Sequence, residues 1–317
     1  MSTDTTDVGA EREGRGRIER LLNSPFLSDL LSNRLALIGI GVIVSMLLIA
    51  VYARFFYDFD ALTSSRLGGT IPDRAAPGWA GGPAATNEML FGTDQAARDI
   101  FKRTMYGAWI AMKFGTITVG ISTALGVTLG IIAAYYGDVT DNVIMRTMDV
   151  LLAFPSLLLA LALVAILPES WGLWRATLAL TLVYTPRFAR VVRGAALKVL
   201  EDEYIDATEA LGAKDPRILF RHIMPNTLAP ITVQSTLNFG LAIIDIAALS
   251  FLGFGAQAGS PSWGLMLSNG VEFGLQSGRW WMSFFPGLFL ALTVLGFNLL
   301  GDGMRDALDP RMQDAVD

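Results

Sequence analysis

Cysteine is absent from this 317-residue chain, and histidine occurs once, at His222. Without cysteine the chain forms no disulfide bond and offers no thiolate to a metal, and one histidine alone makes no metal site. Charged residues are scarce as well, at 17% of the chain, where a soluble domain carries about 25%. Hydrophobic residues make up 52%, and the mean hydropathy is +0.47. This composition excludes an ordinary soluble enzyme and indicates a polytopic membrane protein.

Sequence motifs for nucleotide binding and hydrolysis are also absent. A Walker A loop needs a glycine directly before its lysine. The four lysines, Lys102, Lys113, Lys198 and Lys214, follow Phe, Met, Leu and Ala instead. The chain has no HExxH pair and no GxSxG elbow, the signatures of two hydrolase classes. We therefore predict no catalytic residue, cofactor or metal site in this chain, and any ATP hydrolysis must occur on another subunit.

Six apolar stretches predict an all-α fold with six transmembrane helices, because a hydrocarbon core about 30 Å thick is crossed by about 20 helical residues. The stretches are residues 35–52, 114–136, 150–167, 171–192, 226–249 and 280–301. Pro155 should kink the third stretch, since proline cannot donate a helical hydrogen bond. The fourth is the most polar, because Arg175, Arg187 and Arg190 flank its uncharged centre.

These spans define the predicted organisation. Residues 1–34 form a cytoplasmic segment with an amphipathic helix, 35–56 the first transmembrane helix, 57–103 an external loop, 104–304 the transmembrane core and 305–317 a cytoplasmic tail. The external loop should become helical near Asp94. Cytoplasmic loops are enriched in Lys and Arg, and 15 of the 24 basic residues lie in the termini, at Arg146 or in residues 187–221. We therefore expect both termini on the cytoplasmic side of the membrane.

A polar island of residues 201–225 separates the fourth and fifth apolar stretches. In its first half, Tyr204, Ala207 and Leu211 recur at helical spacing, and acidic residues precede them where a helix N-terminus favours negative charge. Gly212 should end this helix, because glycine readily adopts the left-handed conformation of a C-cap.

The second half of the polar island begins with Asp215 and Pro216, which resemble an N-cap and a first-turn proline. Pro225 should stop this second helix before the next apolar run. We therefore predict two short helices joined at a glycine. They are too polar to enter lipid, so their partner must lie outside the membrane, in the loop between the fourth and fifth spans.

Few polar side chains interrupt the predicted spans. Asp245 lies within the fifth, where an ionisable residue is costly in lipid and faces the bundle interior or water. It is either a pathway or gate residue or an acid that holds two helices together. Gln234 and Asn238, one turn apart, either line the same path or form interhelical hydrogen bonds. Asp149, near the cytoplasmic end of the third span, is expected to pair with Arg146.

The polar island resembles the EAA motif of ABC-importer permeases. In that family Glu-Ala-Ala is followed after three residues by Gly, and after nine more by Ile, any residue, Leu and Pro. The island has Asp206-Ala207-Thr208, then Gly212, then His222-Ile223-Met224-Pro225 at the same spacing.

Other stretches resemble the dipeptide, oligopeptide and nickel permeases, in the second of their two permease types (MetI-like, binding-protein-dependent inner membrane components). They are Phe91-Gly92-Thr93-Asp94, Arg98-Asp99, Tyr106-Gly107-Ala108, Leu151 to Pro155, Leu249 to Gly253, Asn298 to Asp302 and Arg305 to Pro310. The family usually has Gly at the position of Ala97 and often Arg at that of Trp109.

The resemblance implies a type I ABC importer in which this chain and a second homologous permease form the pathway through the lipid bilayer. Two cytoplasmic ATPase subunits would bind ATP and Mg, an extracytoplasmic binding protein would deliver a peptide-like substrate, and no nucleic acid takes part. The polar island would form the coupling helices that dock on the ATPase. The residues assigned to this contact are Tyr204, Asp206, Ala207, Glu209, Ala210, Leu211, Gly212, Arg217 and Pro225. The substrate stays open among dipeptides, longer oligopeptides, glutathione, nickel chelates and other small solutes.

The main alternative is an ion-coupled secondary carrier that uses Asp245 and Asp149 as proton or ion sites. It requires transport by the lone chain under an ion gradient, and it gives the polar island no role. The paired, interrupted spans typical of many such carriers are not visible in the sequence. A third hypothesis is a non-transporting membrane scaffold. Such a protein has no need of a charged residue within a span, so it gives no reason for Asp245.

Overall fold

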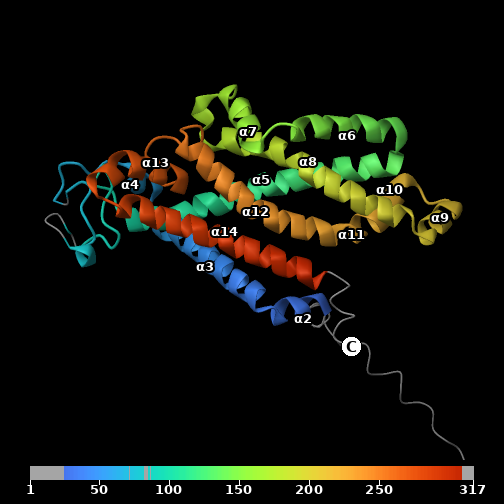
Figure 1. Ribbon diagram of the computed structural model, residues 1–317, viewed down its shortest axis with the longest axis horizontal. Helices are drawn as coiled ribbons and strands as arrows, with labels where there is room; N and C mark the ends of the chain where they lie inside the picture. Colours follow the sequence, from blue (N-terminus) through green and yellow to red (C-terminus); the bar gives the residue numbers. More distant parts are fainter. Residues whose placement is uncertain (1–24, 71, 82–84, 86, 309–317) are drawn as a thin grey trace, which may run out of the picture.

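The computed structural model describes residues 25–70, 72–81, 85 and 87–308. Figure 1 shows long helices that run roughly along the long axis of the molecule, with α4 and α13 toward one end and α9 and α10 toward the other. Within the described residues no β-strand occurs, so the predicted all-α class is confirmed. Most of the amphipathic N-terminal segment and residues 309–317 of the predicted tail lie outside the described residues.

The helices are α2 (Pro25–Ser32), α3 (Arg34–Phe56), α4 (Phe59–Thr63), η1 (Gly78–Ala80), α5 (Ile100–Tyr136), α6 (Asp138–Leu152), α7 (Ser156–Ala165), η2 (Glu169–Trp171), α8 (Leu173–Leu200), α9 (Glu203–Ala210), α10 (Asp215–Ile218), η3 (Leu219–Ile223), α11 (Met224–Asn226), α12 (Leu228–Phe251), α13 (Trp263–Phe273), η4 (Leu275–Ser277) and α14 (Trp281–Ala307).

Four of these helices, α3, α5, α12 and α14, are long and apolar enough to cross a membrane. The bent pair α6 and α7 adds a fifth crossing if it counts as one span. Helix α8 has 28 residues, enough to cross, but basic residues from Arg175 to Lys198 make it more polar than the other long helices. The protein is therefore multi-pass, and the number of six spans stays a prediction.

The third predicted span, residues 150–167, is not one kinked helix. Helix α6 ends at Leu152 and α7 begins at Ser156, and the two meet at 92°. Pro155 explains the break, because proline lacks an N–H and also disfavours helical geometry at the preceding residue, Phe154. The predicted position of the kink is confirmed, but the prediction of one continuous helix is wrong, because the chain bends by 92° there.

Helix α6 is held against α8 by two ion pairs. Arg193 donates to both carboxylate oxygens of Asp141 at 2.5 and 2.6 Å, and Arg190 donates to Asp149 at 2.7 Å. The predicted pairing of Asp149 with Arg146 is therefore wrong. The turn at Gly137, between α5 and α6, brings α6 alongside α8, where a guanidinium group of the neighbouring helix reaches the acid.

Helix α5 begins 14 residues before the predicted span, at Ile100, and its 37 residues extend about 55 Å. The chain is not yet helical at Asp94. The helix starts only after Asp99, whose carboxylate accepts hydrogen bonds from the N–H groups of Phe101 and Lys102. Burial raises the pKa of Asp99, against the opposing effect of these bonds.

Helices α5 and α8 pack closely at the centre of the molecule. At Gly126 a Cβ atom would lie 2.2 Å from the Cβ of Phe188, and at Gly130 it would lie 2.6 Å from the carbonyl oxygen of Ala189. Both distances are too short for any side chain, so the glycines set how near the two helices come. The closeness buries Phe188 completely.

At the end of the bundle that carries α4, the buried Arg103 ties two loops to α5. Its guanidinium donates to the carbonyl oxygens of Leu62, Gly259 and Ser260, the last two at 2.9 and 3.1 Å. Asp94 lies beside it and accepts from Arg98 at 2.8 Å. The loop predicted to be external is thus fastened to the segment between α12 and α13.

The described ends of the chain meet at the other end of the bundle. Asn33 caps α3 and its side-chain amide donates to Asp306 near the end of α14, at 3.5 Å. Leu30, Ala36 and Met304 form a small buried cluster there. In Figure 1, α2 lies beside the last turns of α14, on the side away from α4 and α13.

Candidate functional site

The polar island consists of two helical pieces joined at a glycine, as predicted. Helix α9 covers Glu203–Ala210, Gly212 has a φ of +82°, and the chain turns helical again at Asp215. The positive φ favours glycine, because other residues are strained in this region. The N–H groups of Gly212 and Ala213 donate to the carbonyls of Glu209 and Thr208, which closes the C-terminus of α9.

The polar island is anchored to the bundle by three isoleucines. Ile205, Ile218 and Ile223 are at most 2% exposed. They pack against the ends of α5 and α8, where the contacted residues are Ile131, Ala134, Val192, Ala196 and Val199. Burial of each side chain contributes about 1.5–3 kcal/mol. These contacts join the island to the ends of two long helices.

Sequence reasoning missed these anchors. The helical stripe that was chosen, Tyr204, Ala207 and Leu211, lies on the exposed face of α9, one position away from the buried Ile205. No local pattern marks Ile205, because its burial depends on contacts with α5 and α8 that form only when the chain folds. A hydrogen bond from the amide of Asn226 to the hydroxyl of Tyr204, at 3.1 Å, also joins the two halves.

The face of the polar island that points away from the bundle is partly apolar. Leu211 is 90% exposed, Phe220 70% and Tyr204 41%. Every residue assigned to the ATPase contact is exposed: Tyr204, Asp206, Ala207, Glu209, Ala210, Leu211, Gly212, Arg217 and Pro225. Large apolar side chains that stay exposed on a polar segment are common at protein interfaces.

Two details of the second half differ from the prediction. Asp215 is the first residue of α10 and not its N-cap, which is Lys214. Pro225 does not stop the helical path, because a π-helical turn, η3, precedes it and α11 leads on to α12. The wider turn allows the chain to pass the proline, whose missing N–H would otherwise leave a gap in the hydrogen-bond pattern.

The predicted intramembrane acid, Asp245, has a specific partner. The hydroxyl of Tyr184 on α8 donates to its carboxylate at 2.6 Å. The guanidinium of Arg187 lies 5.3 Å from the centre of the same tyrosine ring. Asp245 is half-buried, so it joins α12 to α8 while part of its surface stays accessible.

Gln234 and Asn238 are not brought together in one site. Gln234 is half-buried and lines a cavity near the end of α14, together with Arg305. Asn238 is 1% exposed, and its amide nitrogen has no hydrogen-bond partner among the described residues. Neither residue contacts Asp245 through a hydrogen bond in the described part of the chain.

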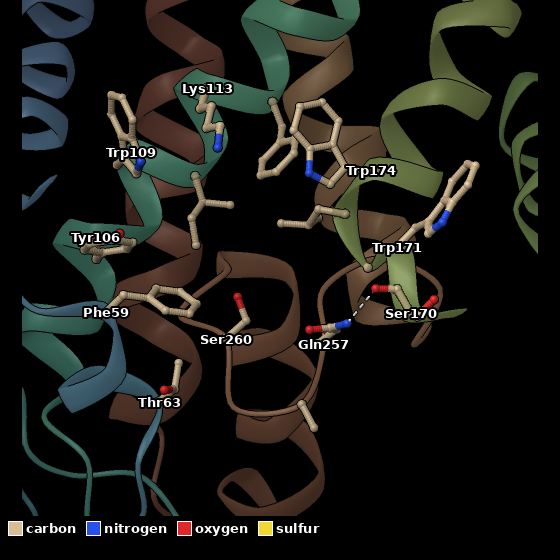
Figure 2. Close-up of a pocket in the computed structure, with 15 residues that line it drawn as sticks. Phe59, Thr63, Tyr106, Trp109, Lys113, Ser170, Trp171, Trp174, Gln257 and Ser260 are labelled. Atoms are coloured by element: carbon tan, nitrogen blue, oxygen red, sulfur yellow. Dashed lines mark hydrogen bonds between the residues drawn. The ribbon is translucent and has the colours of Figure 1, made fainter. Parts of the chain in front are cut away.

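A cavity of about 550 Å³, which we call the outer pocket, opens at the end of the bundle that carries α4. Figure 2 shows its walls: Lys113, Trp109 and Trp174 lie on one side, and Thr63, Ser260 and Gln257 on the other. The amide of Gln257 donates to the carbonyl of Ser170 at 3.0 Å. Sequence reasoning assigned no binding role to Lys113, because the aromatic side chains around it come from distant segments.

Metal binding has no candidate within the described residues, where no three His, Asp or Glu side chains gather into a possible ligand set.

Comparisons with known proteins find membrane permeases that are similar to this chain along most of its length. The dipeptide transport system permease protein DppC of Alkalihalophilus pseudofirmus is 48% identical over 285 residues, covering 90% of this chain and 88% of the relative. DppC of Escherichia coli K12 is 44% identical over 281 residues, covering 89% and 90%. The oligopeptide transport system permease protein OppC of Bacillus subtilis is 39% identical over 282 residues, covering 89% and 87%.

A solved structure shares the fold. A chain from an inward-facing structure of the MetNI methionine ABC transporter matches with a TM-score of 0.50 and 19% identity, covering 66% of this chain and 98% of that one. Residues 126–314 match the model of the family described as "Binding-protein-dependent transport system inner membrane component". With this match and relatives of up to 48% identity along most of its length, the chain belongs to the binding-protein-dependent transport system inner membrane components, the permeases of ABC importers.

Proposed function

We propose that this protein is one of two permease subunits of an ATP-driven importer of short peptides. Relatives named as dipeptide and oligopeptide permeases cover about nine-tenths of the chain, which supports a peptide as substrate. In this proposal a second homologous permease completes the pathway, two ATPase subunits bind ATP and Mg on the cytoplasmic side, and an extracytoplasmic binding protein delivers the peptide. Both termini and the polar island face the cytoplasm.

The observation that carries the proposal is the two-sided character of the polar island. One side inserts Ile205, Ile218 and Ile223 into the bundle, while the other exposes Leu211 and Phe220. A short helix with an exposed apolar face can lie in a groove of a partner. ATP-driven closure of the ATPase pair would then move the polar island as a rigid body.

The isoleucine anchors would transmit this movement into α5 and α8, the helices that they contact. Since α8 also carries Tyr184, the partner of Asp245, a displacement of α8 relative to α12 would reach the acid within the fifth predicted span. Asp245, Gln234 and Asn238 are then candidates for residues that line or gate the pathway.

The proposal is tested by a charge on the exposed face of the polar island. Leu211→Asp should leave the protein in the membrane, because this side chain is 90% exposed. It should abolish copurification of the ATPase subunits and reduce ATP-driven peptide uptake by at least tenfold. Leu67→Asp is the matched control, since Leu67 is 62% exposed in the loop that carries α4 and η1. Normal ATPase copurification and uptake by Leu211→Asp would refute the coupling assignment.

The ion-coupled carrier finds less support. Asp149 and Asp245 bond to α8 at Arg190 and Tyr184, six residues or about 9 Å apart along that helix, so each acid has its own partner and they form no shared site. Family membership also favours the permease. Ion-driven uptake by the lone chain in liposomes would reverse this conclusion.

A further inference from the structure

The outer pocket has no part in the coupling of ATP hydrolysis. We propose that it binds the C-terminal carboxylate of a short peptide at the ammonium group of Lys113, with the adjacent apolar side chain of the peptide against the rings of Trp109 and Trp174. This inference rests on the proposed function and adds to it a recognition site within the permease itself.

Charge is the first argument. Lys113 is the only charged side chain among the fifteen residues that line the outer pocket. Its ammonium group lies 5.2 Å from the ring centre of Phe114 and 5.7 Å from that of Trp174. Among the described residues no carboxylate forms an ion pair with it. A cation held by aromatic faces and not neutralised by an acid is available to an anionic ligand.

The walls specify the rest of the ligand. Six of the fifteen residues that line the pocket are aromatic, and their rings favour an apolar group next to the anion. These rings belong to Phe59, Tyr106, Trp109, Phe114, Trp171 and Trp174. Opposite Lys113, the side chains of Thr63, Gln257 and Ser260 offer hydrogen-bonding groups (Figure 2). The amide nitrogen of Gln257 is already bound to Ser170, so its oxygen is the group left to accept from a peptide N–H. The pocket therefore offers partners for a carboxylate, an apolar side chain and an amide, the three groups found together at the C-terminal end of a peptide.

The size of the pocket suits such a ligand. A volume of about 550 Å³ lies within the range of about 300–1,000 Å³ found for small-molecule sites. An adjoining cavity of about 610 Å³ shares Lys113, Trp109, Tyr106 and Phe59 with it. This second cavity also contains Arg54 and Asp58, so it can hold the remainder of a longer peptide, including its ammonium group.

The position of Lys113 agrees with a role at the entrance of the pathway. It lies 23 residues, or about 35 Å, from the other end of α5 at Tyr136, which is more than the thickness of a hydrocarbon core of about 30 Å. In the orientation of the proposed function, the outer pocket is therefore at the extracytoplasmic face, where the binding protein releases its peptide.

The test measures binding of a defined peptide to the purified complex of permeases and ATPases in nanodiscs of zwitterionic lipid. Radiolabelled alanylphenylalanine and its C-terminal amide are the probes, without the binding protein. Loss of one charge-assisted contact should weaken binding of the acid about ten- to a hundredfold in Lys113→Met and leave the amide unchanged. Lys113→Arg should keep the preference for the acid. Lys102→Met, a change to a half-exposed lysine on the same helix that pairs with Asp99 at 3.6 Å outside the pocket, is the matched control and should keep the wild-type preference for the acid.

Three other results would overturn the inference. They are equal binding of acid and amide by the wild type, unchanged binding by Lys113→Met, and a loss of peptide binding when phosphatidylglycerol is added, which would assign Lys113 to a lipid headgroup. Uptake is measured in parallel with the binding protein and ATP present. If the wild type imports the peptide but shows no preference for the acid, only the inference fails. If the complete complex shows no ATP-driven uptake of any peptide, the proposed function itself fails.

Discussion

Tyr184 shows how one side chain makes an acid tolerable inside a membrane protein. A carboxylate in the middle of a span is costly unless it is bonded or reached by water. The tyrosine hydroxyl supplies a bond of 2.6 Å to Asp245, and the tyrosine itself is completely buried. The pair therefore links the middle of α8 to the C-terminal third of α12.

Removal of this hydroxyl should be measurable. Tyr184→Phe leaves one oxygen of Asp245 without its partner, and we expect a loss of about 1 kcal/mol in the stability of the complex. The thermal unfolding midpoint of the purified complex would fall accordingly. Tyr52→Phe, at a tyrosine that is 46% exposed on α3, should leave the midpoint unchanged. Equal midpoints for wild type and Tyr184→Phe would show that the bond contributes nothing.

Sequence reasoning found the acid and not its partner. Asp245 is recognisable because it interrupts an apolar run, whereas Tyr184 resembles any aromatic residue in a span until α8 and α12 are placed side by side. Gly212 was predictable for the opposite reason, since a helix that ends at a glycine is a local pattern. The wrong partner predicted for Asp149 has the same cause. Its true partner, Arg190, lies 41 residues away in the sequence, where no local pattern points to it.

At the scale of elements, the contact between α5 and α8 organises the bundle. Gly126 and Gly130 face α8 one turn apart, and there is no room at either position for a Cβ atom. Small residues allow helix backbones to approach closely in membranes, where dispersion forces and not the hydrophobic effect hold helices together. At the exposed Gly120 on the same helix, a Cβ atom would have no neighbour within 4 Å.

The two positions give a matched pair of substitutions. Gly126→Leu should destabilise the protein by about 1–3 kcal/mol or prevent assembly, because the new side chain would overlap Phe188. Gly120→Leu should be tolerated. The yield of monodisperse complex in size-exclusion chromatography and its unfolding midpoint measure the difference. Similar behaviour of the two variants would mean that α5 and α8 are not packed as described.

The element boundaries show where sequence patterns are insufficient. Apolar runs located α3, α12 and α14 closely, because these helices coincide with long, predominantly apolar stretches. Apolar runs did not reveal the first turns of α5, because these turns contain the charged residues Lys102 and Arg103 and extend beyond the hydrocarbon core. They also joined α6 to α7, because composition alone does not distinguish a kink at Pro155 from a bend of 92°.

At the scale of the whole molecule, the two ends of the bundle have different roles. One end is fastened by Arg103 and contains the outer pocket, while the other carries the polar island on its isoleucine anchors. Helices α5 and α8 connect the two, since Phe114 and Trp174 line the outer pocket and Ile131 and Val199 contact the island. A movement of the island can thus reach the proposed peptide site through these two helices.

The central claim, that the exposed face of the polar island docks on an ATPase in the cytoplasm, has a direct test because the chain contains no cysteine. Leu211→Cys introduces a single thiol at a position that is 90% exposed, and a membrane-impermeant maleimide reports its accessibility. We predict no labelling in intact cells, rapid labelling in inside-out vesicles stripped of the ATPase subunits, and protection when these subunits are bound. Labelling from the outside of the cell, or equal labelling with and without the ATPase subunits, would contradict the account.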